Sequence, residues 1–230
     1  MTIFFHPVDG FLKSERHFWI RIIKKYTDHF EGHEKTWKEV TNKTPIHILQ
    51  ELAIATEEFF TFHPFLNLAP LHIAVERGSM QLCQYIIAKT EDKNPKGTMV
   101  LSSQIYVHDC SYKISNKILE PWLEKLVSDG LGVDKKMTPL HLAAMNGNIE
   151  VCQLILDDLD DVTPINENEK SPFLMATTNG HFEICKIFIE QLKDKNPADK
   201  YGHTPLHVAA RNGHLKICRL ILEATTGNFF

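Results

Sequence analysis

The sequence predicts an all-α fold in which short helix–turn–helix units stack into a solenoid. Over residues 138–230, proline, glycine and cysteine each recur at one constant spacing of about 33 residues, which is typical of a helical repeat array. Each glycine follows an asparagine, a pair that ends helices, and each cysteine stands among apolar residues at helical spacing. The recurring residues are Pro139, Pro172 and Pro205, then Gly147, Gly180 and Gly213, then Cys152, Cys185 and Cys218.

The first helix of each unit has sequence signals at both ends. Thr138 can cap a helix through its hydroxyl, and Pro139 suits the first turn because that position needs no N–H. Small residues follow, and Gly147 then accepts the left-handed conformation that stops the helix. A second helix is expected from Ile149, and the polar stretch DDVTPINENEK is predicted to form a turn or hairpin.

This unit resembles the ankyrin repeat, whose signature T-P-L-H-x-A-A-x-x-G occurs in full at 138–147 and 204–213. The resemblance implies an ankyrin-repeat solenoid with hairpin loops between the helix pairs. Clear matches cover 69–97 and 138–230, and weaker traces cover 44–68 and 98–137.

The spacing of the motifs predicts about six units, two of them irregular. The interval from Pro70 to Pro139 is two periods plus three, so we expect one irregular unit with a net insertion between them. A TPIH motif at 44–47 stands less than one period before the APLH motif at 69–72, so that unit is expected to be shortened. The predicted units are 44–68 (shortened), 69–97, 98–137 (irregular), 138–170, 171–203 and 204–230.

The extra residues of the irregular unit are expected within 104–115, as a longer loop. The preferred interpretation is a drifted repeat with a tolerated loop. The alternative is an insertion on a functional face, where repeat arrays often carry their insertions.

The N-terminal stretch 1–43 has no repeat motif. Its segment FLKSERHFWIRIIKKYTDHF is helical in pattern and is predicted to be an N-terminal helical cap, because a solenoid needs a polar end. An amphipathic helix on a membrane surface is the alternative.

Two features depart from the pattern of the resembled family. Leu174 stands where the other units have histidine, so unit 171–203 is expected to be less rigid. Lys136 and Glu169 occupy the hairpin position that Gly202 holds in the last hairpin, so those two turns are expected to be looser or of another type.

Composition excludes several classes. Apolar residues make up 43% of the 230, enough to bury a core. The net charge of −4 argues against the basic surface that nucleic-acid binding needs. No apolar run approaches the ~18 residues of a membrane span. Five cysteines cannot all pair internally, so a reducing compartment is expected: the cytoplasm, with the nucleus as the alternative.

The residues that could carry chemistry belong to the repeat motif instead. The motif histidines recur along a stacked row and do not converge on a metal, and the cysteines of the second helices are expected to be buried small hydrophobes. His108-Asp109-Cys110 is interpreted as an accident of composition, because adjacent residues cannot usually form a nucleophile–base–orienter line. No phosphate-cradling motif occurs. We therefore expect no catalytic residue, no metal, no cofactor and no enzyme.

The resemblance implies a non-enzymatic scaffold that binds a protein partner through a concave face and hairpin tips. Tyr201 and Arg211 are the residue types that most often anchor interfaces. The tip candidates are Lys135, Met137, Glu167, Asn168, Lys170, Lys200, Tyr201 and His203. The first-helix candidates are Glu76, Arg77, Met145, Asn146, Thr178, Asn179, Arg211 and Asn212.

Two further hypotheses stay open. The first is a cytoplasmic ankyrin segment of a larger receptor, channel or signalling enzyme, because Leu220, Ile221 and Leu222 have no further helix to cover them. Further repeats, self-association or another domain would cover that end. The second is a modification substrate, because Asn196 sits near the position that asparaginyl hydroxylases modify in ankyrin hairpins.

Overall fold

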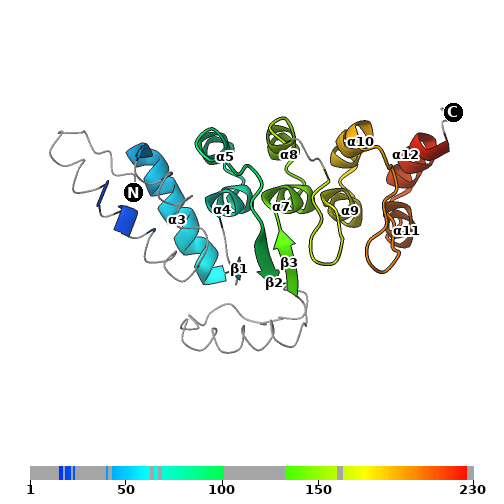
Figure 1. Cartoon of the computed structure of the whole chain (residues 1–230), viewed down its shortest axis with the longest axis horizontal. Helices are drawn as coiled ribbons and strands as arrows, with labels where there is room; N and C mark the ends of the chain where they lie inside the picture. The colour runs from blue at the N-terminus through cyan, green and yellow to red at the C-terminus, as the bar shows by residue number, and fades with distance from the viewer. Residues whose placement is uncertain are drawn as a thin grey trace.

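The structure is a computed structural model that describes residues 16–17, 19–21, 23, 40, 43–62, 65–66, 69–100, 133–159 and 163–226. Within these ranges, helix pairs stack side by side in two layers (Figure 1). The first helices of the pairs are α4 (Pro70–Arg77), α7 (Pro139–Asn146), α9 (Pro172–Thr178) and α11 (Pro205–Arg211). The second helices are α5 (Met80–Ile87), α8 (Ile149–Leu156), α10 (Phe182–Gln191) and α12 (Leu215–Thr226).

Each helix packs against its partner and against the equivalent helix of the next pair. In the first layer α4 contacts α7, α7 contacts α9 and α9 contacts α11, and the second layer repeats this order from α5 to α12. The apolar residues of both layers form one continuous core. The predicted stack of helix–turn–helix units is therefore confirmed.

The predicted signals set the ends of the first helices. The Thr138 hydroxyl accepts the backbone N–H of His141, and Pro139 lies in the first turn of α7. Gly147 ends α7 in the left-handed conformation, with φ of 79°, and its N–H reaches the Ala143 carbonyl. Because these residue types recur with a constant period, the first helices begin at equivalent positions and stack in register.

The first two helix pairs pack directly on each other, so the prediction of an irregular repeat at 98–137 is wrong. His72 Nε2 lies 3.1 Å from the Met137 carbonyl, and Asn148 Nδ2 donates to the Val75 carbonyl at 3.2 Å. Helices α4 and α5 contact α7 and α8, which leaves no place for another pair between them. The interval from Pro70 to Pro139 is therefore one period with a long insertion.

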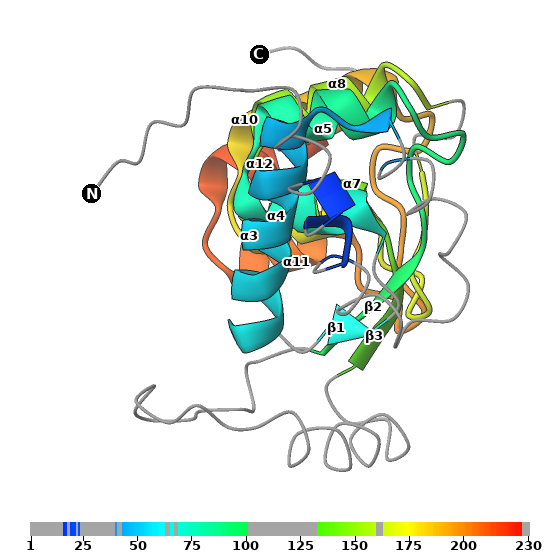
Figure 2. The same cartoon turned by 90° about the vertical axis from the view of Figure 1, so that its left-hand side faces the viewer.

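The additional residues belong to the hairpin between these two pairs. Strands β2 (Gly97–Val100) and β3 (Val133–Met137) pair antiparallel, from Gly97 opposite Met137 to Val100 opposite Val133. Strand β1 (Phe65–Leu66) pairs with β2 on its other side, giving the order β1-β2-β3 (Figure 2). The insertion predicted within 104–115 lies outside the described residues.

Residues 44–68 form one long helix and a short strand instead of a shortened helix pair. Helix α3 (Ile46–Phe62) runs unbroken for 17 residues and packs on both α4 and α5 (Figures 1 and 2). The segment contains no glycine or proline that would end a first helix after two turns. The TPIH motif also lacks its usual bonds, because Thr44 Oγ1 is buried without a hydrogen-bond partner and His47 is exposed.

Helix α3 lies at the end of the stack where a cap was predicted for 1–43. Most of that stretch lies outside the described residues. Of its described residues, Ile23 and Val40 are fully buried, and Arg16 Nη1 donates to the Thr44 carbonyl at 2.9 Å.

The hairpin turn at Glu169 has the backbone conformation of the glycine turn, and Lys136 has the same conformation within strand β3. The φ angles are 60° at Lys136, 56° at Glu169 and 79° at Gly202, all left-handed. The Glu169 N–H donates to the Asn166 carbonyl just as the Gly202 N–H donates to the Asp199 carbonyl. The expectation of a looser turn or another turn type is therefore wrong at Glu169. Lys136 instead lies at an irregularity of the β2–β3 ladder, between Lys135 opposite Thr98 and Met137 opposite Gly97. Both non-glycine residues take the strained conformation.

The cysteines of the second helices lie in the core. Cys83, Cys152 and Cys185 are fully buried, and desolvation raises the pKa of their thiols to about 12, 12 and 11 respectively. The cysteines that the structure describes are free thiols. Among the described residues, no helix has the length and apolar character needed to cross a membrane.

Candidate functional site

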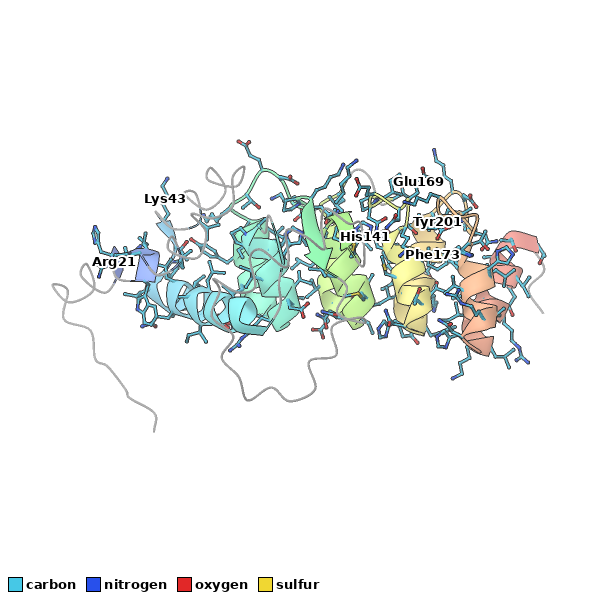
Figure 3. All side chains as sticks on the ribbon, turned by 90° about the horizontal axis from the view of Figure 1, so that it is seen from below. Arg21, Lys43, His141, Glu169, Phe173 and Tyr201 are labelled. Carbon is cyan, nitrogen blue, oxygen red and sulfur yellow. The ribbon has the colours of Figure 1, made fainter. Side chains whose placement is uncertain are left out.

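The predicted contact residues form two groups at opposite ends of the first helices. The hairpin residues precede each first helix, and the second group stands where that helix ends. An eight-residue helix is about 12 Å long, so the structure does not bring the two groups together at one point. Glu169 and Tyr201 lie along the hairpin edge of the array (Figure 3).

Each of the last two hairpins is tied together by one side chain. Asn166 Oδ1 accepts the N–H groups of Asn168 and Lys170 at 2.9 and 3.0 Å. In the next hairpin Asp199 Oδ1 accepts the N–H groups of Tyr201 and His203 at 2.9 and 2.8 Å. These bonds satisfy the turn backbone and hold the tips in fixed positions.

Hydrogen bonds to its charged form keep the Asp199 carboxyl ionised. Burial would raise its pKa, but the backbone N–H groups of His203 and Tyr201 and the His203 ring lower it below the ordinary value. The His203 Nδ1 atom lies 3.4 Å from Asp199 Oδ2. The tip is therefore held by an ionised carboxylate at neutral pH.

Tyr201 is the most exposed large apolar side chain among the described residues, with 63% of its surface accessible. Lys200 Nζ lies 5.0 Å from the centre of its ring, and the His203 ring centre lies 6.2 Å away. The Lys200 N–H donates to the Asn168 carbonyl at 3.2 Å, which joins the two hairpins. The result is an aromatic and cationic platform on a fixed base.

The ends of the first helices are joined by bonds between repeats. Asn146 Nδ2 donates to Glu76 Oε2 at 3.1 Å, and Asn212 Nδ2 donates to the Thr178 carbonyl at 2.9 Å. Asn179 Nδ2 bonds to the Met175 carbonyl of its own helix. Asn146 and Asn212 therefore also join neighbouring repeats, which sequence reasoning missed.

The predicted contact residues differ in exposure. Met137 is fully buried beside Asn166, and its carbonyl accepts from His72, so its prediction as a tip contact is wrong. Strand alternation turns this side chain inward. Lys135 pairs with Thr98 in the strand ladder. Those exposed are Arg77, Asn146, Glu167, Thr178, Asn179, Lys200, Tyr201, His203, Arg211 and Asn212, and those half-buried are Glu76, Met145, Asn168 and Lys170.

Sequence reasoning did not single out an apolar hollow beside the hairpin edge. Ile165 is 50% exposed and lines a cavity of about 130 Å³. The sequence feature that could have indicated this hollow is Ile165, an apolar residue in an otherwise polar hairpin. The apolar lining comes from Ile165, Pro172, Phe173, Leu174, Phe188, Leu192, Pro197 and Ala198.

The motif histidines act as links between repeats. His141 Nδ1 accepts the Thr138 N–H at 3.2 Å, so the ring proton lies on Nε2, which donates to the Lys170 carbonyl at 3.0 Å. His72 makes the equivalent bonds to Ala69 and Met137. Within the described part of the chain, histidine, cysteine and carboxylate side chains do not gather in groups that could hold a metal ion.

The modification candidate Asn196 has a structural bond of its own. Its Oδ1 atom accepts the Leu206 N–H at 2.9 Å, and Asn94 makes the equivalent bond to Leu140 at 3.1 Å. Asn196 therefore joins the loop before the hairpin to the first turn of α11. Its hydroxylation stays a prediction.

A stack of equivalent helix pairs joined by hairpins defines a helical repeat array. Residues 140–228 match the family model of ankyrin repeats, in three copies. No curated protein matches the chain. Ankyrin repeats are generally protein–protein interaction modules and are typically non-catalytic.

Proposed function

We propose that this protein is a non-enzymatic scaffold that binds a protein partner along the hairpin edge, with Tyr201 as the main anchor. The observation that carries the proposal is the platform of Tyr201, Lys200 and His203. A large aromatic side chain stands exposed on a turn whose backbone is fixed by Asp199. Because the platform is already ordered, little conformational entropy is lost when a partner binds.

The surroundings of the platform indicate a partner of mixed polarity. Glu167, Asn168 and Lys170 belong to the neighbouring hairpin, which is joined to the platform through Lys200. Charges of both signs alternate along this edge, so a partner of a single charge is not favoured. Arg211 stands exposed at the far end of α11 and is proposed as a second, separate anchor.

The experiment uses the whole chain as immobilised bait and quantifies captured proteins by mass spectrometry. Tyr201→Ala is expected to lower capture of the specific partner by roughly tenfold or more, because exposed aromatic anchors carry much of the binding energy. Gln153→Ala, an exposed substitution on the second layer, is the matched control and should leave capture unchanged. Capture that survives both Tyr201→Ala and Arg211→Ala would overturn the proposal.

A second candidate is an ankyrin segment that works inside a larger receptor, channel or signalling enzyme. Exposed apolar side chains on the last helix pair favour it, with Leu215 at 62% and Leu222 at 46% accessible. Ile221 was expected to be uncovered but is fully buried. We also propose a cytoplasmic setting, because the described cysteines are free thiols. The size of the intact endogenous protein on immunoblots, compared with the 26.4 kDa of this chain, distinguishes an isolated scaffold from a larger parent.

A further inference from the structure

The helix pair α9–α10 and the loop before it depart from the repeat pattern at positions that lie far apart in sequence. Leu174 replaces the motif histidine, and Phe173 replaces the leucine that precedes it in the other units. Thr163 stands where two other loops have Asn94 and Asn196. All three departures line the apolar hollow beside the hairpin edge. Positions where a regular sequence breaks its own rules are expected to be functional or strained.

Leu174 changes the chemistry of the junction between α9 and the following hairpin. In the preceding unit, His141 Nε2 donates to the Lys170 carbonyl at the base of the next hairpin, at 3.0 Å. A leucine side chain cannot donate a hydrogen bond, so it offers an apolar surface at the equivalent position. Leu174 is buried and lines the hollow.

The hollow has a buried aromatic base and an exposed rim. Phe173 and Phe188 are fully buried, with ring centres 6.2 Å apart, and form the base. Ile165 and Ala198 are exposed and belong to the two hairpins on either side. Glu169 lies on this edge and Phe173 in the adjoining helix α9 (Figure 3). The hollow is therefore an apolar surface that is open to solvent.

Glu169 carries the charge of the hollow, because the other described residues that line it are uncharged. Its carboxylate is exposed and has no hydrogen bond or ion pair with a described residue. Its backbone is left-handed, with φ of 56°, a conformation that glycine would adopt without strain. Glu167 is also exposed in this hairpin, whereas Lys170 is half-buried. The exposed charge beside the hollow is therefore acidic and complements a cationic group.

The size of the hollow selects a single side chain as its occupant. Its volume is about 130 Å³, whereas sites for whole small molecules have about 300–1,000 Å³. An apolar cavity of about 150 Å³ holds one benzene ring. A leucine, isoleucine or methionine side chain therefore fits the hollow, and a larger ligand does not.

We propose that the hollow binds one aliphatic side chain of an extended peptide segment, while a neighbouring arginine or lysine of that segment pairs with Glu169. The inference rests on the proposed function, because it gives the sequence class of a partner that binds along the hairpin edge. Ala198 and Tyr201 belong to the same hairpin, with two residues between them. A short extended segment therefore reaches both the hollow and the platform at Tyr201.

The test selects binders to the whole chain from a random peptide library displayed on phage. Enriched sequences are expected to place leucine, isoleucine or methionine next to arginine or lysine. The most enriched peptide is then labelled, and its dissociation constant is measured by fluorescence polarisation. Replacing its aliphatic residue with alanine should weaken binding by roughly tenfold or more, because that side chain loses its apolar burial.

A variant that fills the hollow locates the binding site. Ala198→Leu places a larger side chain at the rim and should weaken peptide binding by roughly tenfold or more. Lys96→Leu is the matched control, because it adds the same side chain at the equivalent exposed position of the first loop. It should leave binding unchanged. Circular dichroism verifies that both variants keep the fold.

The charge of Glu169 is tested with a substitution that keeps its shape. Glu169→Gln should weaken binding by about twofold to fivefold, as expected for an exposed ion pair. A peptide whose basic residue is glutamine should bind both proteins equally. Glu167→Gln is the matched control, because Glu167 is exposed in the same hairpin but does not line the hollow. Equal effects of the two substitutions would overturn the pairing with Glu169.

The same peptide measured on Tyr201→Ala separates this inference from the proposed function. Binding that is lost in Tyr201→Ala but kept in Ala198→Leu would overturn the hollow and leave the hairpin edge as the interface. Binding that is lost in Ala198→Leu alone would support the hollow and overturn Tyr201 as the main anchor. A selection that enriches no aliphatic and basic pattern would overturn the proposed peptide class.

Discussion

At the residue scale, the hairpin turns show how one backbone conformation is reached with different residue types. Lys136 and Glu169 adopt the left-handed conformation that Gly202 adopts at the equivalent position. A side chain makes this conformation cost about 1–2 kcal/mol, whereas glycine adopts it without that cost. The hydrogen bonds of the Asn166 side chain keep Glu169 in this conformation.

This strain predicts that Glu169→Gly stabilises the protein by about 0.5–1 kcal/mol, after allowing for the greater freedom of glycine in the unfolded chain. Glu169 is exposed, so no buried contact is lost. The reverse substitution Gly202→Glu should destabilise by a similar amount. Urea unfolding of the two variants measures both effects, and a destabilised Glu169→Gly protein would contradict the explanation.

The histidines of the motif are expected to differ sharply in their contribution to stability. His141 is fully buried and bonds to Thr138 and Lys170, whereas His207 is exposed and bonds only to its own cap among the described residues. We predict that His141→Ala lowers the free energy of unfolding by about 3 kcal/mol and His207→Ala by less than about 1 kcal/mol. Equal losses of unfolding free energy for the two variants in urea titrations would contradict the role of His141 as a link between repeats.

At the element scale, the last hairpin depends on one carboxylate. Asp199 is 7% accessible and accepts two backbone N–H groups, and its pKa is lowered in the folded protein. A group with a lowered folded pKa stabilises the protein above its unfolded pKa and loses that contribution as the pH falls through the folded pKa. The acid-dependent loss from Asp199 is therefore expected below about pH 4.

Asparagine at this position provides the sharpest test, because Asn166 already makes the same two bonds in the preceding hairpin. Asp199→Asn should keep most of the stability at pH 7 and remove part of the loss between pH 4 and pH 3. Asp199→Ala should cost about 1–3 kcal/mol at pH 7. Unfolding free energies measured at pH 7, 4 and 3 check both statements, and an unchanged acid dependence in Asp199→Asn would refute the assignment.

At the scale of the whole molecule, the continuity of the stack does not depend on residues 101–132. The pairs α4–α5 and α7–α8 contact each other directly, and β2 meets β3 at the pair Val100–Val133. A two-residue turn is long enough to replace the segment between these two strands, since the strands are antiparallel neighbours.

We therefore predict that replacing 101–132 with Asn-Gly leaves a folded array. Its stability should be unchanged or higher by up to about 2 kcal/mol, because a shorter loop costs less entropy to close. Circular dichroism and urea unfolding measure the result. Collapse of the cooperative transition would mean that this segment carries a structural unit of the stack.

The sequence by itself determined the repeating unit, because its signals are local. Thr138, Pro139 and Gly147 set the ends of a helix through their own backbone preferences, and Cys152 and its neighbours mark a buried helix face. Such signals act within a few residues, so they could be read without knowing what the chain packs against. The tip position of Tyr201 was implied by the resemblance to the ankyrin repeat, and its side chain is exposed.

Only the tertiary structure decided where the irregular segments belong. The interval from Pro70 to Pro139 fits two periods with a small insertion as well as one period with a long one, and the contact between α4 and α7 selects the second. The inward side chain of Met137 and the unbroken helix α3 likewise depend on distant packing partners. Local sequence preferences determine the helices of each unit. Which units pack against each other depends on tertiary contacts, and the spacing of the motifs does not specify these contacts.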